Sequence, residues 1–143
     1  MLKTYKYRIY SNNKQIELIN KTIGCCRFVF NHYLAKRIEL YKAEKKSLSY
    51  IDNANDLKSL KQEFEWLKEV DSISLQQTLK DLDQSYKNFF RRVKQGREKV
   101  GFPKFKSKKN HKQSSRSQCV NNNISIRNDK IKFPKLGLIK FAN

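Results

Sequence analysis

The spacing of the apolar residues changes along the chain, and this change limits the folds that the sequence can adopt. Residues 1–10 alternate between apolar and polar side chains, which predicts a strand. One face of this strand carries Tyr5, Tyr7 and Ile9, and the other carries Lys6 and Arg8. We expect the tyrosine face to be buried and the basic face to be exposed. Ser11 and Asn12 then offer side-chain oxygens that can cap a helix.

Three amphipathic helices are predicted next, because the apolar spacing becomes three and four residues. The first covers about residues 13–45, with the stripe Ile16, Ile19, Ile23, Cys26, Phe30, Leu34, Ile38 and Tyr41. After a polar stretch at 44–55, a shorter helix carries Leu57, Leu60, Phe64 and Leu67 on one face. The third begins at the caps Asp71 and Ser72, and its stripe, which ends before Gly96, is Leu75, Leu79, Leu82, Tyr86, Phe89 and Val93. Such helices bury their stripes against one another as a small bundle.

Strand patterns return towards the C-terminus. Residues 123–133 hold two alternating arms around Asn128 and Asp129, which both tolerate positive φ, so a tight hairpin turn is expected. Residues 136–141 predict a last short strand. With one strand before the helices and about four after them, we expect an α+β fold in which a helical bundle is inserted after the first strand of a small β-barrel-like unit. The expected divisions are 1–10 for the first strand, 11–95 for the helices, and 96–143 for a basic loop and the remaining strands.

The charge of the chain points to a polyanionic partner. There are 32 Lys and Arg residues against 13 Asp and Glu, for a formal net charge of +19. Such a surplus repels itself in a compact fold, and DNA or RNA offsets it with the release of condensed counterions. Residues 91–116 alone contain eleven of these cations and a single acid, Glu98. We therefore expect a nucleic-acid-binding protein that contacts phosphates mainly through this segment.

An anionic membrane is the alternative partner, and the sequence disfavours it. The chain has no lipidation motif and no apolar run of about 18 residues that could span a bilayer. Lys3, Lys6 and Arg8 interrupt the start, where a signal peptide needs an apolar stretch. We expect no membrane partner and an intracellular, cytoplasmic location.

The sequence does not predict an active site. Cys25, Cys26 and Cys119 fit no metal-ligand spacing, so we expect unpaired thiols, no metal and no cofactor. Asp81 and Asp83 are two residues apart on a predicted helix, so their carboxylates should diverge instead of converging on a metal ion. The chain also lacks a phosphate-cradling glycine-rich loop and a recognisable nucleophile–base set. We expect that this chain is not an enzyme.

Basic side chains near the first strand, at the end of the third helix and in the loop are candidate nucleic-acid contacts. They are Lys6, Arg8, Arg91, Arg92, Lys104, Lys106, Lys108, Lys109 and Arg116. The lysines suit phosphate contacts, whereas the arginines on the helix either clamp phosphates or stabilise the helix C-terminus. In the same loop, Phe102 and Phe105 either stack on bases or anchor the loop to the core.

Six ordered segments of the sequence resemble one known family. They are YKYRIY (5–10), GCCRFVFNHYLAKRIELYK (24–42), WLKEVDS (66–72), LQQTLKDLDQSYKNFFRRVK (75–94), GFPKFKSKK (101–109) and IKFPKLGLIKF (131–141). Together they resemble the N-terminal part of the TnpB (OrfB) proteins, which are transposon-encoded RNA-guided DNA endonucleases related to type V CRISPR effectors. The resemblance implies a wedge domain, a small barrel, around an inserted helical recognition domain. It also implies that the RuvC-like nuclease and zinc-binding regions lie beyond residue 143, so that a C-terminal nuclease half is missing.

The resemblance further implies partners and site residues. It implies a prokaryotic, nucleoid-associated protein that binds a guide RNA from the transposon end and target DNA, reads a short adjacent motif, and does not cleave DNA by itself. The motif-reading positions of the family match Tyr50, Gln76 and Asn121. Ser72 and Val120 depart from the family pattern, which has a basic residue and a hydroxyl residue there, so the motif that this chain reads stays open.

Two other interpretations remain. The chain could be a stand-alone helix-turn-helix-like DNA-binding regulator or transposase accessory protein. It could also be the product of a decayed, truncated gene that folds poorly. Dependence on a guide RNA separates the RNA-guided module from the regulator.

Overall fold

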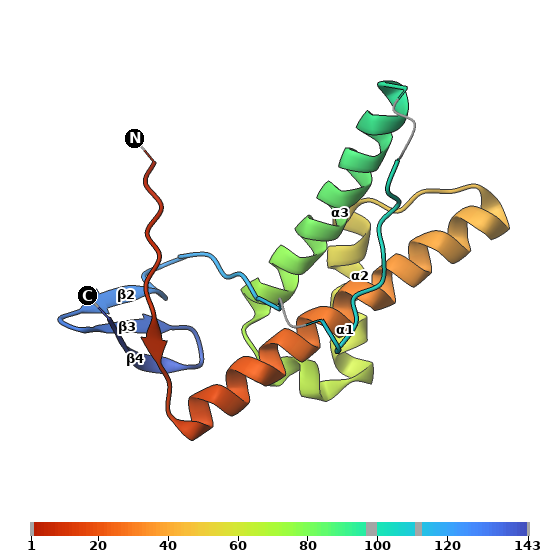
Figure 1. The fold of residues 1–143 in the computed structure, drawn as a ribbon. Coiled ribbons are helices and arrows are strands. Elements are labelled where there is room, and N and C mark those ends of the chain that lie inside the picture. The colour runs from red at the N-terminus through yellow and green to blue at the C-terminus, as the bar shows by residue number, and fades with distance from the viewer. Residues whose placement is uncertain (1, 97–99, 111–112, 143) are drawn as a thin grey trace.

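The computed structural model describes residues 2–96, 100–110 and 113–142. The fold is α+β, with a helical bundle and a small antiparallel sheet that lies beside the start of the first helix (Figure 1). The elements are β1 (Ile9–Tyr10), α1 (Asn13–Glu44), α2 (Tyr50–Glu63), the 3₁₀ helix η1 (Glu65–Glu69), α3 (Ser72–Lys94), β2 (Ser125–Arg127), β3 (Lys130–Phe133) and β4 (Gly137–Phe141). No helix of the described residues combines the length and the apolar content that crossing a bilayer requires.

The first helix has the predicted bounds because both of its ends are capped. The Asn12 side chain accepts a hydrogen bond from the Gln15 N–H at 2.8 Å, and the Gln15 side chain accepts one from the Asn12 N–H at 3.0 Å. This reciprocal capping box satisfies two free donors of the first turn. α1 then continues for 32 residues to Lys45, whose left-handed backbone (φ 58°) ends the helix.

The second helix begins earlier than the sequence predicts and also ends earlier. Ser49 and Asp52 form another capping box inside the expected polar break, so α2 starts at Tyr50. Phe64 and Leu67 were expected on this helix, but Phe64 leaves helical geometry (φ −119°, ψ 85°). Leu67 is nevertheless completely buried, because η1 turns it back into the core.

The third helix confirms the predicted cap and most of the predicted stripe. The Asp71 side chain accepts a hydrogen bond from the Ile73 N–H at 3.2 Å, and Leu75, Leu79 and Leu82 have no exposed surface. Burying a leucine side chain contributes about 1.5–3 kcal/mol. The end of the stripe differs from the prediction, because the last turns of α3 project beyond the other helices (Figure 1). Val93, expected in the core, is 50% exposed.

The core of the bundle is formed where α1, α2, η1 and α3 meet. Its buried members are Cys25, Cys26, Val29, Phe30, Tyr33, Leu34, Leu57, Leu60, Leu67, Val70, Leu75, Leu79 and Leu82. The predicted stripe of α1 is buried in its middle, but Ile16 and Tyr41 near its ends are 46% and 54% exposed. The middle of α1 and the first half of α3 therefore supply most of the packing.

The sheet has the order β1-β4-β3-β2, and all neighbouring strands are antiparallel. Arg127 pairs with Lys130, so the turn between β2 and β3 consists of Asn128 and Asp129, as predicted. Asn128 has the positive φ (55°) that this turn requires. The Gln15 side-chain amide donates to the carbonyls of residues 136 and 138 at 3.2 and 2.9 Å, so the start of α1 is tied to the sheet.

The N-terminal segment does not form the predicted half-buried strand. It pairs with β4 only at Ile9 and Tyr10, and Tyr5 and Tyr7 are 67% and 51% exposed. The Tyr7 ring contacts Phe141 edge-on, with centroids 5.4 Å apart. The prediction of buried tyrosines was wrong because Tyr5 and Tyr7 precede β1, which begins at Ile9, so neither lies on a paired strand of the sheet.

The sheet also has fewer strands than predicted. Three strands follow the helices in the described part of the chain, whereas about four were expected. β1 and β2 form the two edges, so the described sheet is open and not barrel-like. Closing a barrel requires the edge strands to pair. With two and three residues, these strands offer few backbone groups for that pairing.

Candidate nucleic-acid interface

The basic segment that follows α3 runs back along the helices towards the sheet (Figure 1). Asn31 of α1 holds it by both ends of its side-chain amide: Nδ2 donates to the Lys106 carbonyl at 2.9 Å, and Oδ1 accepts from the Lys106 N–H at 2.7 Å. The Lys106 ammonium lies 4.6 Å from the centroid of the buried Phe30 ring. Backbone and side chain of Lys106 are therefore both fixed on α1.

A glutamine holds the next part of the segment in shape. Gln113 Nε2 donates to the carbonyls of Lys108 and Asn110 at 2.9 and 2.7 Å. The Lys109 N–H donates to Ser107 Oγ at 3.2 Å. Lys104, Lys108 and Lys109 are exposed, so their charges face solvent from a backbone that is already held. Lysines on such a backbone suit phosphates, which attract point charges without a demand for exact geometry.

Two contacts fasten the segment to α3. Arg116 Nη2 forms an ion pair with Asp81 Oδ1 at 2.6 Å, and Ser117 Oγ donates to Asp71 Oδ2 at 2.5 Å. Asp71 thus caps α3 and binds the incoming chain with the same carboxylate. Arg116, a candidate phosphate contact, has much of its charge balanced by Asp81.

The candidate motif-reading residue Gln76 lies on the exposed side of α3. Its neighbour Gln77 is 9% exposed, and Gln77 Nε2 donates to Gln118 Oε1 at 3.3 Å. On the other side, the Lys80 ammonium lies 5.7 Å from the ring centroid of Tyr50, the first residue of α2. Lys80 is one turn after Gln76, so its side chain connects Tyr50 with the turn of α3 that follows Gln76.

Asn121 lies at the tip of a tight turn that the sequence prediction missed. Asn121 and Asn122 have φ of 53° and 61°, a left-handed conformation that asparagine tolerates better than most residues. The turn is closed by Asn123, whose N–H donates to the Val120 carbonyl at 3.2 Å and whose Oδ1 accepts from the Val120 N–H at 2.6 Å. The three consecutive asparagines at 121–123 could have indicated this turn in the sequence. The chain enters this turn from Gln118, next to the first half of α3.

The remaining cationic candidates lie at opposite ends of the molecule (Figure 1). Lys6 and Arg8 are exposed beside the sheet, and the Arg8 guanidinium lies 5.9 Å from the Tyr10 ring centroid. Arg91 is exposed and Arg92 half-buried in the last turn of α3, where the helix dipole favours cations. Lys6 and Arg8 therefore do not join Arg91 and Arg92 in one cluster.

The carboxylates of α3 do not converge. Asp81 pairs with Arg116, whereas Asp83 pairs with Arg37 at 3.4 Å and Lys87 at 3.2 Å, which confirms that the two acids diverge. Among residues 2–96, 100–110 and 113–142, no three His, Cys, Asp or Glu side chains are grouped so that they could hold a metal ion.

The cysteines of the chain are unpaired, as predicted. Cys25 and Cys26 are buried, and Cys119 is exposed. Burial raises the pKa of the Cys25 thiol to about 11 and also raises the pKa of Cys26. The two buried thiols are therefore protonated at neutral pH and act as small apolar side chains.

The two loop phenylalanines differ. The Phe102 ring lies edge-on to Tyr86 and Phe89, with centroids 5.5 and 5.2 Å apart, so it anchors the loop to the projecting end of α3. It is still 42% exposed, and Phe105 is 56% exposed. Neither ring is a core residue.

The fold and this surface define a small α+β protein with a preorganised basic segment packed on a helical bundle. Residues 1–46 match the family HTH_OrfB_IS605, described as a helix-turn-helix domain. The chain is 35% identical over 144 residues to InsQ of Escherichia coli (strain K12), named "Putative RNA-guided DNA endonuclease InsQ". That alignment covers 99% of the chain and 34% of InsQ.

Two further relatives have a similar identity to the chain but differ in the share of their length that it covers. A Streptomyces pristinaespiralis protein, named "Putative RNA-guided DNA endonuclease", is 33% identical over 115 residues, which cover 79% of the chain and 27% of that protein. The virulence protein VsdF of Salmonella dublin is 32% identical over 117 residues, which cover 76% of the chain and 95% of VsdF. The chain thus spans about a third of the length of the two endonuclease relatives. It belongs to the OrfB (TnpB) family.

Proposed function

We propose that this chain is the nucleic-acid-binding, N-terminal module of a transposon-associated RNA-guided DNA nuclease. In this proposal it binds guide RNA and target DNA, including the motif next to the target, and does not cleave DNA by itself. The helices form the recognition domain, which is inserted after the first strand of a wedge domain. The names of InsQ and the Streptomyces protein support the class of activity for the full-length proteins.

One observation carries the proposal: the two hydrogen bonds between Asn31 and the Lys106 backbone. They hold a lysine-rich segment on the bundle before any partner is present. The exposed Lys104, Lys108 and Lys109 are therefore presented on an ordered backbone, and binding needs to order little more than their side chains. A preorganised cationic strip of this kind fits a phosphate backbone better than it fits a general need for solubility.

A separate group of residues suits the reading of bases. Gln76 is exposed on α3, Tyr50 lies beside the next turn of that helix, and Asn121 stands at the tip of a turn approached from Gln118. Amide side chains can form paired hydrogen bonds with adenine, whereas lysines contact phosphates of any sequence. We propose that the loop lysines position the nucleic acid and that Gln76 and Asn121 read the adjacent motif.

The arrangement of the acids supports binding without cleavage. Metal-dependent phosphodiester hydrolysis requires carboxylates that converge on metal ions. Asp81 and Asp83 each neutralise arginine or lysine side chains and point to different partners. We therefore assign DNA cleavage in the relatives to parts of those proteins that this chain does not span.

The alternative is a stand-alone regulator that reads DNA with a helix-turn-helix. That motif needs two helices at about 90–120°, joined by a turn of a few residues. Residues 1–46 match a helix-turn-helix family, but α1 runs without interruption from Asn13 to Glu44 within them. The matched residues thus contain one helix, and the second helix of such a motif would be α2, which follows after residues 45–49.

A competition assay separates the two functions. Labelled duplexes with candidate adjacent motifs are competed against scrambled duplexes, with and without RNA transcribed from the transposon end. The module predicts that the preference for a motif appears only with the RNA. Equal preference with and without the RNA would favour the regulator. Incubation of the same complexes with Mg²⁺ should leave the DNA intact, and guide-dependent cutting that is lost on changing an acid of this chain would contradict the proposal.

A further inference from the structure

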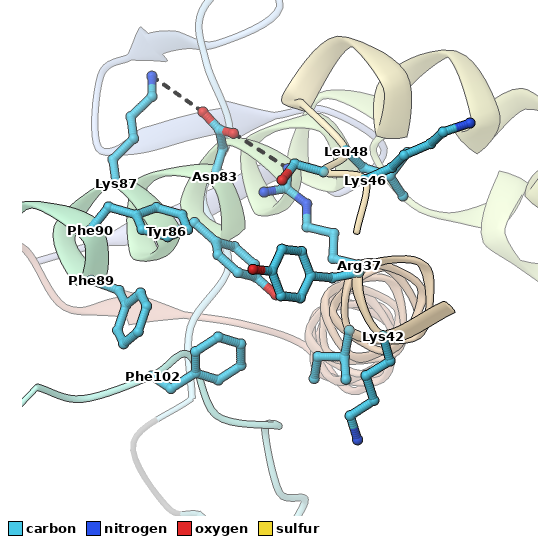
Figure 2. Close-up of a pocket in the computed structure, with 13 residues that line it drawn as sticks. Arg37, Lys42, Lys46, Leu48, Asp83, Tyr86, Lys87, Phe89, Phe90 and Phe102 are labelled. Atoms are coloured by element: carbon cyan, nitrogen blue, oxygen red, sulfur yellow. Dashed lines mark hydrogen bonds and ion pairs between the residues drawn. The ribbon is translucent and has the colours of Figure 1, made fainter. Parts of the chain in front are cut away.

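A large apolar pocket lies between the C-terminal ends of α1 and α3, and Phe102 of the basic segment forms part of its wall (Figure 2). It has a volume of about 580 Å³, within the range of about 300–1,000 Å³ that is usual for ligand sites. Its walls include the aromatic rings of Tyr41, Tyr86, Phe89, Phe90 and Phe102. Figure 2 shows Phe89 and Phe102 on one side of this space and Lys42 on the other.

Several aromatic side chains in the walls of the pocket are exposed to solvent. Phe90 and Tyr41 are each 54% exposed, and Phe102 is 42% exposed. Phe102 contacts Tyr86 and Phe89 edge-on, with 90° and 85° between the ring planes, whereas Tyr86 and Phe90 are stacked at 28°. An apolar surface of this kind on a soluble chain marks a binding site.

The charges around the pocket identify the kind of partner. The lining contains Arg37, Lys42, Lys46 and Lys87 against one acid, Asp83. Asp83 is shared by two of these cations, Arg37 at 3.4 Å and Lys87 at 3.2 Å. The surroundings of the aromatic walls are therefore strongly positive, and an occupant should combine a flat apolar part with negative charge.

A buried arginine shapes the floor of the pocket. Arg37 is 6% exposed, its guanidinium lies 4.9 Å from the centroid of the Tyr86 ring, and its Nε has no hydrogen-bond partner among the described residues. A cation against a ring face holds that ring in place. Burying a guanidinium is costly unless it is paired, and here Asp83 and the Tyr86 ring supply that pairing.

We propose that this pocket takes an unstacked base of single-stranded nucleic acid, with Lys42, Lys46 and Lys87 near the flanking phosphates. Base–aromatic stacking tolerates any sequence, because every base has a flat apolar face. The pocket is also continuous with the basic segment, since Phe102 lies two residues before Lys104. The inference rests on the proposed function and adds a place where a base leaves the stack. RNA and DNA share the required chemistry.

The test compares nucleic acids that have bases with ones that lack them. Single-stranded RNA and DNA oligonucleotides, and abasic oligonucleotides of the same length, are titrated with the full 143-residue chain by fluorescence anisotropy. Phe90→Ala should weaken binding of the base-bearing strands roughly 5- to 100-fold and change binding of the abasic strands little. Comparison of the RNA and DNA arms identifies which strand the pocket prefers.

Two controls keep the result specific. Phe90→Tyr retains the ring and should retain affinity, and Ile51→Ala removes an exposed apolar side chain (66% exposed) outside the pocket and should change nothing. The inference would be overturned if Phe90→Ala had unchanged affinity, or if it lost affinity equally for base-bearing and abasic strands. The proposed function would still stand in that case, provided that the wild type binds with the expected salt dependence. If Phe90→Ala instead altered the oligomeric state of the protein in sedimentation and left nucleic-acid binding unchanged, the pocket would be a contact between copies of the chain and the inference would be wrong. Absence of any binding at low salt would overturn both proposals.

Discussion

The side-chain amide of Asn31 binds both backbone groups of Lys106, with hydrogen bonds of 2.9 and 2.7 Å between residues 75 positions apart in the chain. An amide is the one neutral side-chain group that can donate and accept in this paired way, as a neighbouring strand would. The contact determines where the basic segment lies on α1. Its role in binding can therefore be separated from the role of the lysine charges.

Asn31→Ala should weaken binding to every nucleic acid severalfold and leave the salt dependence nearly unchanged. The charges remain, but the freed segment must now be ordered on binding. The fold should lose only about 1–2 kcal/mol, because two partly exposed hydrogen bonds are removed. Anisotropy titrations at several salt concentrations and urea unfolding measure both effects. Asn20→Ala, on an exposed position of the same helix, is the matched control. Unaltered affinity for Asn31→Ala would show that preorganisation contributes nothing.

Gln76 and Gln77 are neighbours with opposite expected roles. Gln76→Ala removes an exposed amide, so it should leave stability and salt dependence unchanged while it lowers discrimination of the adjacent motif by about 1–3 kcal/mol. Gln77→Ala removes the partly buried hydrogen bond to Gln118 and should reduce stability without changing the motif preference. Competition between motif-bearing and scrambled duplexes with guide RNA present measures discrimination. If Gln76→Ala weakens both duplexes equally, its assignment as a reading residue is wrong.

The thiols should react in two classes. Burial raises the pKa of Cys25 to about 11 and raises that of Cys26, so neither offers thiolate at neutral pH, whereas Cys119 is exposed. A thiol reagent such as DTNB should therefore modify one cysteine of the native protein promptly and all three after unfolding in denaturant. Cys119→Ser should abolish the prompt reaction. Rapid modification of three thiols in the native protein would contradict the packing of α1 in the core.

Stability should fall in acid partly through Asp56. Burial acts to raise the pKa of this carboxyl, but hydrogen bonds from Tyr33 and Lys36 and the Lys36 charge outweigh it and hold the pKa below its usual value. Because the folded-state pKa is depressed, this stabilisation is present above the unfolded value of about 3.9 and is lost as pH falls through the folded pKa. Tyr33→Phe removes one of these hydrogen bonds to Asp56. Between pH 5 and pH 2 the free energy of unfolding should therefore fall further for the wild type than for Tyr33→Phe. The difference should be about 1 kcal/mol, because Asp56 is partly exposed. Urea unfolding across this pH range tests it, and equal acid losses would contradict it.

The helices were largely predictable because their signals are local. Neighbouring residues of the α3 apolar stripe are only three or four positions apart, and the Asp71 cap contacts the first turn of the same helix. The two-residue turn at Asn128 is also indicated by its own residues. The start of α2 was missed although Ser49 and Asp52 carry a capping-box pattern, because the stretch around them is polar. Local chemistry therefore gave the elements, with errors at their ends.

The arrangement of the site was not predictable, because it depends on contacts distant in sequence. The sequence identifies Lys106 as a cation but contains no signal that Asn31 binds its backbone or that its ammonium lies over Phe30. Alternation around Tyr5 and Tyr7 correctly suggests extended chain, but it cannot show whether another layer covers the tyrosines. Asp81 and Arg116, 35 residues apart, are a similar case.

Salt titration of binding tests the central claim most directly. With about six phosphate contacts, the logarithm of the binding constant for RNA or duplex DNA should fall with the logarithm of salt concentration with a slope of about −4 to −5. The variant Lys104→Ala/Lys108→Ala/Lys109→Ala should flatten this slope by up to about 3, whereas Lys106→Ala should add little, because that ammonium lies over Phe30. A slope near zero for the wild type, or no binding at low salt, would contradict the account.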